Sequence, residues 1–329
     1  MSYVIGIDLG ATNLRVVIAD EDGHFIKLVS EKTAREGDAL VVSKQIVHMI
    51  QRALSKANLT LKEIKAIGVG SIGPLNLKEG AIVNTPNLPF NYIPITKPLR
   101  EYLGKPVFLL NDCTTAVIGE KYFGAGKGLE NLVYVTISTG IGGGAYVDGH
   151  LLLGKDGNAA EIGHMVVDPL GRLICGCGRR GHWEAYCSGS GIPKFVRFFL
   201  KEKLKEGKIR TSLLDIVQGD IDRIDAKVFF KVVRENDALA LEILDIIGRY
   251  NAVGIANIIN VYDPSLITLG GSVVLYNKEY ILPYISKYVK DYAINRVPKI
   301  EVTPLGGNVV LYGAVAMALG LEKIEPIRP

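Results

Sequence analysis

The first part of the chain alternates short apolar runs with turn residues, and this pattern predicts strands. Residues 3–8, 14–19 and 24–29 each predict one strand, and the turns between them are short enough for an antiparallel meander. Apolar residues at helical spacing between Leu40 and Leu54 then predict a helix. A strand over 64–69, a helix over 97–103 and a strand over 107–110 follow. Because strands and helices alternate here, we expect a parallel sheet.

From Leu132 the opening pattern returns, with a strand, a turn of small residues, a second strand, an Asp-Gly turn and a third strand. Gly140 lies 130 positions after Gly10, and Ser138 lies the same distance after Asp8. This spacing predicts that the two halves share one design. Residues 192–250 are strongly helical, and the basic stretch 201–210 within them predicts a solvated helix face.

The remaining pattern predicts a strand over 266–269, a helix around 280–293, a strand over 300–302 and a last apolar helix over 309–319. We predict an α/β protein of two domains. The small N-terminal α/β domain is expected to comprise residues 1–112 and 306–329, and the large C-terminal α/β domain residues 113–305. No linker separates them, so we expect the two domains to meet across a cleft.

Composition and charge restrict the class of protein. A chain of 329 residues is long enough for two domains, and its 48% apolar and 22% charged residues exclude a disordered, collagen-like or coiled-coil protein. The net charge is only +4 and no basic block dominates, so we expect no nucleic-acid partner. No apolar run approaches the roughly 18 residues of a membrane span, and no basic region precedes the first apolar stretch. We therefore expect a cytoplasmic protein without a membrane partner.

Small, polar or acidic residues follow each predicted strand. In doubly wound α/β architectures, ligands bind beyond the carboxyl ends of the strands. Glycine lets backbone N–H groups approach a polyphosphate, and hydroxyl side chains add further donors. A single such loop fits an ordinary hairpin turn equally well. Together, however, these residues favour a nucleotide site: Asp8, Gly10, Thr12, Ser71, Gly73, Asn111, Asp112, Ser138, Thr139, Gly140, Gly270 and Gly271.

Two of these residues are carboxylates with candidate roles in phosphoryl transfer. Asp112 lies between a predicted strand and a segment compatible with a helix, so it fits a plain helix N-cap. It also fits a general base that accepts a proton from a substrate hydroxyl while that oxygen attacks a γ-phosphoryl group. Asp8 is suited to hold Mg²⁺, directly or through water.

The segment between residues 160 and 189 is the richest in candidate ligands. His164, Cys175, Cys177 and His182 form the pattern H-x₁₀-C-x-C-x₄-H, and these nitrogen and sulfur ligands are the kind that tetrahedral Zn²⁺ prefers. Buried free thiols with incidental histidines are the alternative. Cys175 and Cys177 lie too close together to pair comfortably as a disulfide.

At these residues the sequence resembles the ROK family of sugar kinases and sugar-responsive repressors. The resemblance covers essentially the whole chain through five motifs in order, GIDLGATNLR, TISTGIGGG, EIGH, CGCGRRGH and LGGS. It implies a two-domain actin-like (ribonuclease H-like) ATPase fold with an interdomain cleft, a structural Zn²⁺, and ATP and Mg²⁺ as cofactors. It also implies a homo-oligomer, either a dimer or a tetramer.

The resemblance assigns roles residue by residue. Asp112 is the expected catalytic base, and the sugar is expected to bind at Gly73, Asn87, Asn111, Asp112, Glu161, His164 and Glu184. The nucleotide is expected at Asp8, Gly10, Thr12, Asn13, Ser138, Thr139, Gly140, Gly142, Gly270 and Gly271. His164 would be shared between zinc and sugar. His182 stands where the family usually has a third cysteine, which makes the zinc site the least regular of these motifs.

We therefore predict an ATP-dependent hexokinase that phosphorylates the 6-hydroxyl of glucose. Fructose, mannose, N-acetylmannosamine and N-acetylglucosamine stay open as substrates, because small differences in pocket shape separate them. A sugar-responsive repressor is disfavoured, since no residues for a DNA-binding segment precede the first motif at Gly6. An actin-like ATPase without a small substrate is disfavoured by the EIGH and CGCGRRGH motifs.

Overall fold

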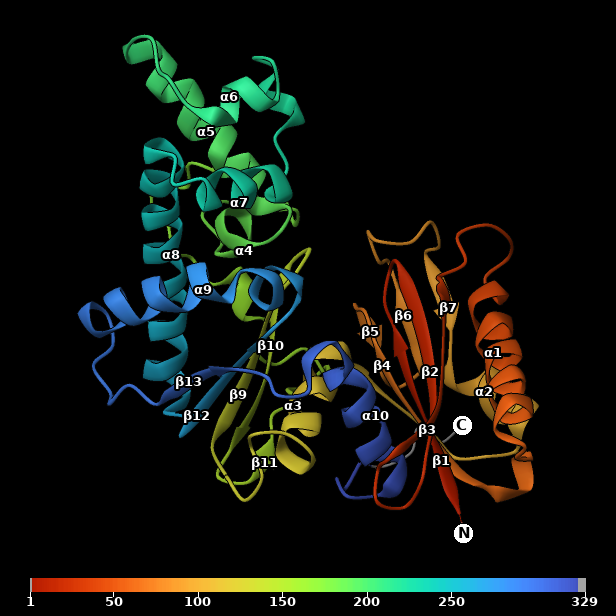
Figure 1. The fold of residues 1–329 in the computed structure, drawn as a ribbon. Coiled ribbons are helices and arrows are strands. Elements are labelled where there is room, and N and C mark those ends of the chain that lie inside the picture. The colour runs from red at the N-terminus through yellow and green to blue at the C-terminus, as the bar shows by residue number, and fades with distance from the viewer. Residues whose placement is uncertain (1, 325–329) are drawn as a thin grey trace. The chain divides into compact units, whose positions relative to one another are not determined.

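The computed structural model describes residues 2–324, and contacts within the chain separate it into two compact units. The first unit takes the described residues of Met1–Tyr134, Gly144–Ala160 and Thr303–Pro329. The second unit takes Val135–Gly143 and Glu161–Val302. The two five-stranded sheets of the fold are coloured along the chain in Figure 1. The α/β class predicted from the sequence is confirmed.

The first sheet has the strand order β3-β2-β1-β4-β8. Strand β1 pairs antiparallel with β2 and parallel with β4, and β4 pairs parallel with β8. The predicted meander and the parallel strands that follow it are therefore confirmed. The strands are β1 (Tyr3–Leu9), β2 (Asn13–Ala19), β3 (Phe25–Lys32), β4 (Ile64–Ser71) and β8 (Val107–Asn111).

The alternation of side chains along β1 explains how both faces of this sheet are buried. Ile5, Ile7 and Leu9 belong to the core on the side of helices α1 (Val41–Ala57) and α2 (Thr96–Leu103). Val4 belongs to the core on the other side, which helix α10 (Val309–Leu319) covers (Figure 1). Gly68 permits the close approach of α10, since a Cβ there would lie 1.9 Å from the Ala314 carbonyl oxygen.

A small three-stranded sheet is the part of the first unit that the sequence pattern misses. It has the order β5-β6-β7, with antiparallel pairing throughout. Its strands are β5 (Leu75–Asn76), β6 (Ala81–Val83) and β7 (Tyr92–Pro94). Runs of two or three residues are too short to show a period, so periodicity carries no signal for them.

The second sheet repeats the strand order of the first, as the spacing of the loops predicts. Its order is β11-β10-β9-β12-β13. In both sheets three consecutive strands form one side, and two later strands continue the sheet next to the first of the three. Strand β10 pairs antiparallel with β11, and β12 pairs parallel with β13. The strands are β9 (Leu132–Ile137), β10 (Ile141–Val147), β11 (His150–Leu151), β12 (Leu266–Gly270) and β13 (Lys299–Val302).

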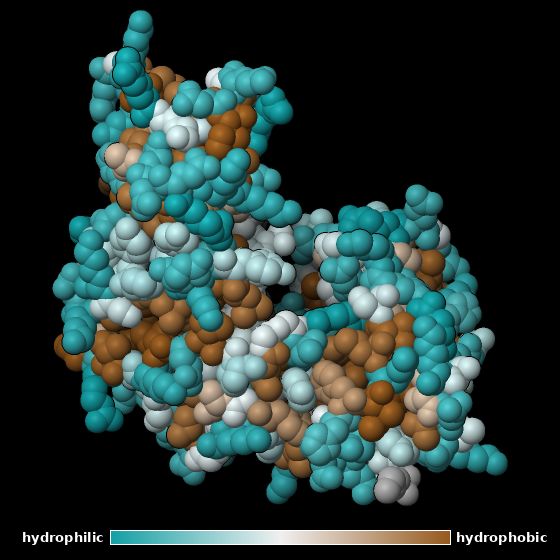
Figure 2. Space-filling model, viewed as in Figure 1, coloured by the Kyte–Doolittle hydropathy of each residue, from teal (hydrophilic) through white to brown (hydrophobic). Residues whose placement is uncertain are grey.

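Helices make up most of the second unit, as predicted for residues 192–250. They are α4 (Glu184–Cys187), α5 (Gly191–Glu206), α6 (Ser212–Ile216), α7 (Ala226–Arg234), α8 (Ala238–Tyr262) and α9 (Ser272–Tyr288). The stretch 201–210 is mostly exposed, and Figure 2 shows the tip of α5 as hydrophilic, which confirms the solvated helix face. Among residues 2–324, none of the helices combines the length and apolar character that crossing a membrane requires.

One predicted helix has the wrong bounds. We expected a helix around 280–293, but α9 begins at Ser272, directly after the glycine turn that ends β12. It ends at Tyr288, and a 3-10 turn follows over Val289–Asp291. Asn277 has non-helical dihedral angles inside α9, which marks a kink between two helical segments.

The compact units divide between Val302 and Thr303, close to the predicted boundary at 305, but they do not divide at the predicted residue 112. Helix α3 (Asp112–Tyr122), which the prediction gave to the large domain, packs on α10 in the first unit. Small residues bring these two helices together: a Cβ on Gly313 would lie 1.7 Å from the Thr115 carbonyl oxygen, and a Cβ on Gly119 would lie 2.4 Å from that of Val309. This close packing joins residues 112–122 to the C-terminal helix.

Candidate functional site

The carboxyl ends of the parallel strands in the first unit meet at one edge of its sheet. Leu9 of β1 is opposite Ser71 of β4, and Ser71 is opposite Asn111 of β8. Gly73 follows β4 and adjoins Asn111, since a Cβ on this glycine would lie 3.6 Å from the Asn111 Nδ2. The structure therefore brings Gly73, Asn111 and Asp112 to the same place.

Asn111, and not Asp112, is the N-cap of helix α3. Its Oδ1 accepts hydrogen bonds from the backbone N–H groups of Cys113 (2.9 Å) and Thr114 (3.4 Å). Asp112 is the first residue of the helix, where the helix dipole favours a negatively charged side chain. The N-cap interpretation of Asp112, which the sequence leaves open, is therefore wrong, because its neighbour satisfies the first turn.

The loop of residues 10–12, predicted to bind phosphate, has two backbone N–H groups without an acceptor among the described residues. The N–H of Gly10 donates a hydrogen bond to the Asn13 carbonyl oxygen (3.0 Å), and a Cβ on Gly10 would lie 2.9 Å from that oxygen. Glycine is thus required for the tight turn. The N–H groups of Ala11 and Thr12 donate no hydrogen bond within residues 2–324. Two adjacent N–H groups at a strand end form an arrangement that suits a phosphate oxygen.

Asp8 is paired with an arginine that the sequence reasoning did not single out. Arg15 lies opposite Asp8 in the β1–β2 register and donates to its Oδ2 from Nε (2.9 Å) and from Nη2. Burial raises the pKa of Asp8, and the Arg15 guanidinium opposes that shift. The second oxygen, Oδ1, accepts no hydrogen bond from residues 2–324 and is left for another ligand. One carboxylate oxygen is enough for Mg²⁺, which keeps several waters and takes substrate phosphates.

The second predicted phosphate loop, residues 138–140, accepts hydrogen bonds from the residues that follow α4. Gly189 N–H donates to the Ser138 carbonyl (2.6 Å), and Ser190 donates to the Thr139 carbonyl from its N–H (3.2 Å) and its hydroxyl (2.8 Å). With these carbonyls bonded, the N–H groups of Thr139 and Gly140 donate no hydrogen bond within the described chain. This half of the duplicated design therefore presents the same kind of donor pair as the first.

Glu184 places a carboxylate oxygen beside Gly140. Glu184 Oε2 accepts the N–H of Ile141 (2.9 Å), and a Cβ on Gly140 would lie 2.4 Å from that oxygen. Gly142 is the second residue of strand β10, two residues beyond Gly140.

The third glycine turn joins this loop at the start of α9. Gly271 has φ of +84°, and a Cβ there would lie 2.4 Å from the Ile137 carbonyl oxygen, so only glycine fits without strain. The hydroxyl oxygens of Ser138 and Ser272 are 3.3 Å apart. Gly270 ends β12 next to this turn. The structure therefore brings Ser138 and the turn at Gly270 and Gly271 together.

The four predicted metal ligands form one cluster, with all ligand atoms within 4.8 Å of one another. The Nδ1 atoms of His164 and His182 are 3.2 Å apart, and the Cys175 and Cys177 sulfurs lie 3.8 and 3.3 Å from the Nδ1 of His164 and His182. A zinc tetrahedron with ordinary bond lengths has edges of about 3.3 Å between nitrogens and about 3.5 Å between nitrogen and sulfur. Burial lowers the pKa of His182, which keeps its ring neutral and a lone pair available. The cluster therefore fits zinc.

The predicted sugar residues of the second unit surround this cluster. His164 turns its other nitrogen, Nε2, to Glu161, at 3.8 Å from Oε2. Glu184 accepts a hydrogen bond from the Cys175 sulfur with its Oε1 (3.5 Å), while its Oε2 binds the second phosphate loop as described above. Glu184 thus links the cluster to that loop. Asn87, by contrast, is an exposed residue of the first unit, in the loop between β6 and β7.

A buried aspartate stabilises the chain around the cluster. Asp168 is 1% exposed and accepts hydrogen bonds from the Arg172 side chain (3.0 Å from Nε) and the Tyr186 hydroxyl (2.6 Å). Burial favours the neutral acid, but the bonds from Arg172 and Tyr186 outweigh it and lower the pKa of Asp168 to about 2. Its backbone packs closely on Gly181, next to His182.

We expect the Asp168 hydrogen bonds to make stability depend on acidic pH. The folded pKa of about 2 lies below the ordinary value of about 3.9, so the contribution is complete above pH 5 and is lost as the pH falls toward 2. Thermal melts between pH 7 and pH 2 would measure this. Asp168→Asn should melt lower than the natural protein at pH 7 and lose less of its Tm on acidification. If the Tm of the two proteins fell by the same amount between pH 7 and pH 2, the assignment would be contradicted.

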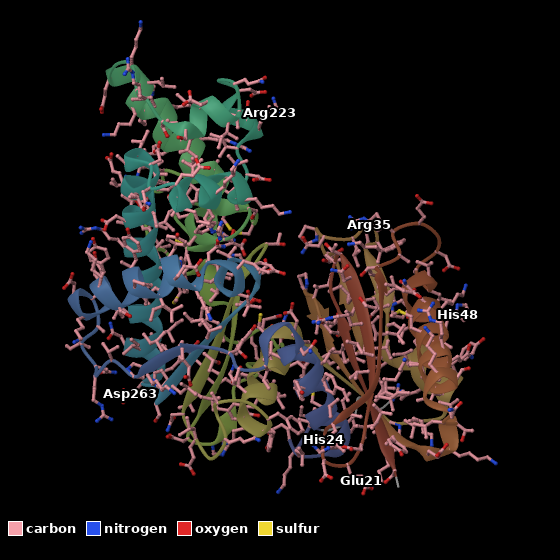
Figure 3. All side chains as sticks on the ribbon, in the orientation of Figure 1. Glu21, His24, Arg35, His48, Arg223 and Asp263 are labelled. Carbon is pink, nitrogen blue, oxygen red and sulfur yellow. The ribbon has the colours of Figure 1, made fainter. Side chains whose placement is uncertain are left out.

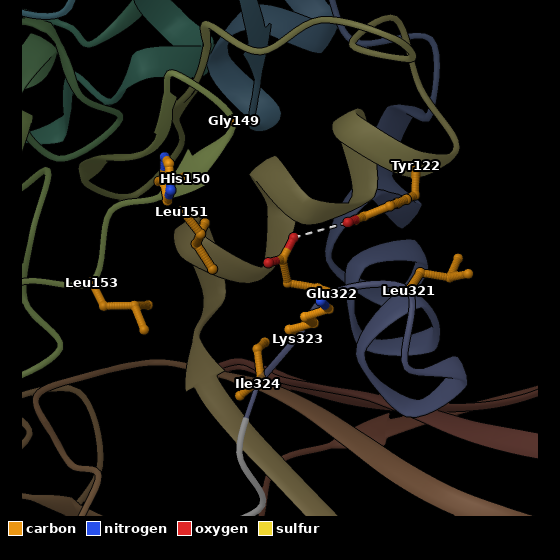
Figure 4. A pocket seen from close by; sticks show the side chains of 9 residues that line it. All are labelled: Tyr122, Gly149, His150, Leu151, Leu153, Leu321, Glu322, Lys323 and Ile324. Atoms are coloured by element: carbon orange, nitrogen blue, oxygen red, sulfur yellow. Dashed lines mark hydrogen bonds between the residues drawn. The ribbon is translucent and has the colours of Figure 1, made fainter.

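The cavity detected in the first unit is separate from these residues. It encloses about 440 Å³ near the end of the described chain, and Glu322 in its wall accepts a hydrogen bond from the Tyr122 hydroxyl (3.0 Å; Figure 4). None of the predicted site residues lines it. The site is therefore defined by the strand ends, the loops and the metal cluster.

Two arginines of the first unit, Arg15 and Arg35, are functional candidates that sequence reasoning missed. Arg15 lies in the motif GIDLGATNLR, but its pairing with Asp8 depends on the register between β1 and β2. Arg35 lies in an exposed segment after β3 and carried no sequence signal.

The chain is similar to known proteins along almost its whole length. The ROK family model matches residues 4–320. A glucokinase of Pyrobaculum calidifontis is 36% identical over 97% of this chain and 95% of its own length, and a glucokinase of Thermotoga maritima is 36% identical over 91% and 93%. Both similarities run along almost the entire chain.

Solved structures show the same fold. A ROK hexokinase from Thermus thermophilus superposes with a TM-score of 0.77 at 29% identity, covering 95% of this chain and 96% of that one. A ROK family glucokinase from Streptomyces griseus, solved with glucose and AMPPNP, gives 0.75 at 28% identity, covering 96% and 99%. Since the family model spans nearly all of the sequence, the chain belongs to the ROK family.

Proposed function

We propose that the protein is an ATP-dependent glucokinase that transfers the γ-phosphoryl group of ATP to the 6-hydroxyl of glucose. The observation that carries the proposal is the 36% identity to a glucokinase over 97% of this chain. The loops support it, because each unit presents paired N–H donors of the kind that bind phosphate. The structure of a similar ROK glucokinase with glucose and AMPPNP supports the same pair of ligands.

In this proposal Asp112 is the general base. Its carboxylate accepts the proton of the sugar 6-hydroxyl while that oxygen attacks the γ-phosphorus, and the bond to the β-phosphate oxygen breaks to release ADP. Asn111 caps helix α3 and so fixes the first turn that carries Asp112. The neighbouring Gly73 and the amide of Asn111 supply further contacts to the sugar, and Asn87, Glu161, His164 and Glu184 are the other proposed sugar ligands.

The nucleotide is proposed to bind at the glycine loops. The N–H groups of Ala11 and Thr12 would bind phosphate oxygens in the first unit, and those of Thr139 and Gly140 in the second. Asn13, Gly142 and the turn at Gly270 and Gly271 complete the proposed set. Asp8 would hold Mg²⁺, which neutralises the charge that develops on the phosphates.

We propose that His164, Cys175, Cys177 and His182 hold a structural Zn²⁺. With His164 Nδ1 in the cluster, its Nε2 is left for a sugar hydroxyl or for Glu161. A bound metal fixes the tautomer of such a ring, so the imidazole would meet the sugar in one orientation. Histidine at position 182 replaces the usual cysteine of the family without breaking the cluster.

A coupled ADP-release assay over a panel of sugars tests the function. The panel contains glucose, fructose, mannose, N-acetylmannosamine and N-acetylglucosamine, each with ATP and with or without Mg²⁺. We expect glucose to give the highest kcat/KM and the reaction to require Mg²⁺. Higher kcat/KM for another sugar would reassign the substrate within the family, and ATP hydrolysis that ignores every sugar would contradict a sugar kinase. The predicted homo-oligomer stays a prediction, which sedimentation can test.

A further inference from the structure

We propose that Arg35 is a positioning residue that couples the nucleotide loop of the first unit to the sugar loop. The sugar loop is defined here as residues 84–89, and the nucleotide loop is residues 10–12. The inference rests on the proposed function, because it assigns ligands to these two loops. It concerns a side chain that contacts neither Asp112 nor the metal cluster among the described residues.

The guanidinium of Arg35 makes one hydrogen bond to each loop. Nη1 donates to the Ala11 carbonyl oxygen and Nη2 donates to the Asn87 carbonyl oxygen, both at 3.2 Å. A guanidinium is a rigid planar fork, so its two bonds hold the two acceptors at a set separation. Arg35 and Asn87 are 52 residues apart in the chain, and this contact ties the sugar loop to the segment after β3.

The same segment also holds the rest of the nucleotide loop. Thr33 donates from its N–H to the Thr12 carbonyl (3.1 Å) and from its hydroxyl to the Gly10 carbonyl (2.6 Å). With Arg35 on Ala11, three consecutive carbonyls each have a donor from residues 33–35. Thr33 is buried and Arg35 is exposed, so Thr33 anchors the segment and Arg35 extends it to the sugar loop. These hydrogen bonds use the carbonyl groups of the loop, and the N–H groups of Ala11 and Thr12 stay available to a ligand.

An ordinary surface ion pair does not explain Arg35. Within residues 2–324 its guanidinium forms no salt bridge, and its two bonds go to uncharged carbonyl oxygens. Figure 3 shows Arg35 at the opposite end of the first unit from Glu21 and His24, which lie at the β2–β3 turn. Because Arg35 is exposed, water competes for both of its hydrogen bonds and their net contribution to stability is small, so its effect should lie in the geometry of the loops.

Coupling follows from this arrangement. A sugar that orders residues 84–89 also holds Arg35, and Arg35 then holds the Ala11 carbonyl and the nucleotide loop. The nucleotide must order the sugar loop by the same free energy, because linkage between two binding sites is reciprocal. We therefore expect glucose to tighten nucleotide binding, and Arg35 to carry much of that effect.

The test measures the Kd of AMPPNP with Mg²⁺ by titration calorimetry, in the absence and in the presence of saturating glucose. In the natural protein we expect glucose to lower this Kd by about tenfold, within the usual range of coupling between sites. In Arg35→Ala the ratio should fall below about twofold, with the Kd of AMPPNP alone changed much less. Arg35→Lys keeps the positive charge but lacks the planar fork, so in this variant too the ratio of the two Kd values should fall, to below about threefold.

The matched control is Lys44→Ala, which removes a positive charge from the same unit. Lys44 is 57% exposed, pairs with Asp38 at 3.2 Å and touches neither loop, so the tenfold ratio should be kept. Each variant is melted first, and Arg35→Ala should stay within about 2 °C of the natural Tm. A larger loss would contradict a purely local role.

Several results would overturn the inference. One is a ratio of Kd values that is unchanged in Arg35→Ala. Another is a full tenfold ratio in Arg35→Lys, which would assign the effect to charge. The third is a natural protein whose affinity for AMPPNP does not change when glucose is added. Failure of the proposed function looks different, because a natural protein that binds neither glucose nor AMPPNP and phosphorylates no sugar refutes the activity itself.

Discussion

Replacing Asp112 by asparagine is expected to lower kcat by about 10²–10⁴-fold, the usual contribution of a general base. The Kd of glucose should change by less than about threefold, because an amide of the same shape still accepts hydrogen bonds from sugar hydroxyls. The fold should persist, since Asn111 supplies the cap of α3. Steady-state kinetics and glucose titration of the same preparation measure both quantities.

Asp38→Asn provides the control for this variant. It makes the same chemical change at an exposed carboxylate of the first unit, which among the described residues pairs only with Lys44 and nearby backbone, so its kcat should match that of the natural protein. A near-normal kcat in Asp112→Asn would remove Asp112 from the role of base. A glucose Kd that weakens as much as kcat falls would assign it to sugar binding alone.

The metal cluster carries the second large effect. Protein purified without chelators should contain about one zinc per chain by elemental analysis. A site occupied at a thousand times its Kd adds about 4 kcal/mol to stability, which corresponds to about 8–16 °C in the Tm of a unit of this size. Strong chelation, or Cys177→Ala, should remove the zinc and lower the Tm by that amount.

Two further variants make the zinc test specific. His182→Ala should lose zinc, whereas His182→Cys restores the usual residue of the family and should keep it. Cys187→Ala is the control, because this buried thiol lies outside the cluster and donates to the Ile247 carbonyl oxygen (3.5 Å). Protein that is free of metal as isolated, yet melts like the chelated form and keeps its activity, would show that the cluster is a packing feature.

Strand and helix positions were largely predictable because they depend on nearby residues. The opening meander, helix α1 and the last helix, which begins at Val309 and ends at Leu319 as predicted, all follow from the period of apolar positions. The duplication was predictable because it repeats small residues at one spacing, and both sheets have the same strand order. The start of α9 was not predicted: this helix begins at Ser272, directly after the glycine turn, and contains a kink at Asn277.

The candidate site divides in the same way. The sequence predicted its four metal ligands as a group, and the structure brings all of them together. It did not show that the Glu184 carboxylate lies beside Gly140 and accepts the N–H of Ile141, because Glu184 is 43 residues further along the chain than Ile141. Nor did it show that Asn111 caps α3, because two adjacent polar residues at a strand end are equally plausible caps until the backbone angles are known.

The sequence by itself determined the class of fold, the two matched halves and the chemistry of the loops, because these depend on local periods and on motifs of adjacent residues. The tertiary structure decided which partners those residues meet. Arg15 pairs with Asp8 through the register of two strands, and Arg35 reaches Asn87 only after the sheet has placed their loops together. Such contacts join residues that are distant in the chain, so they follow from the packing of whole elements and leave no pattern in the sequence.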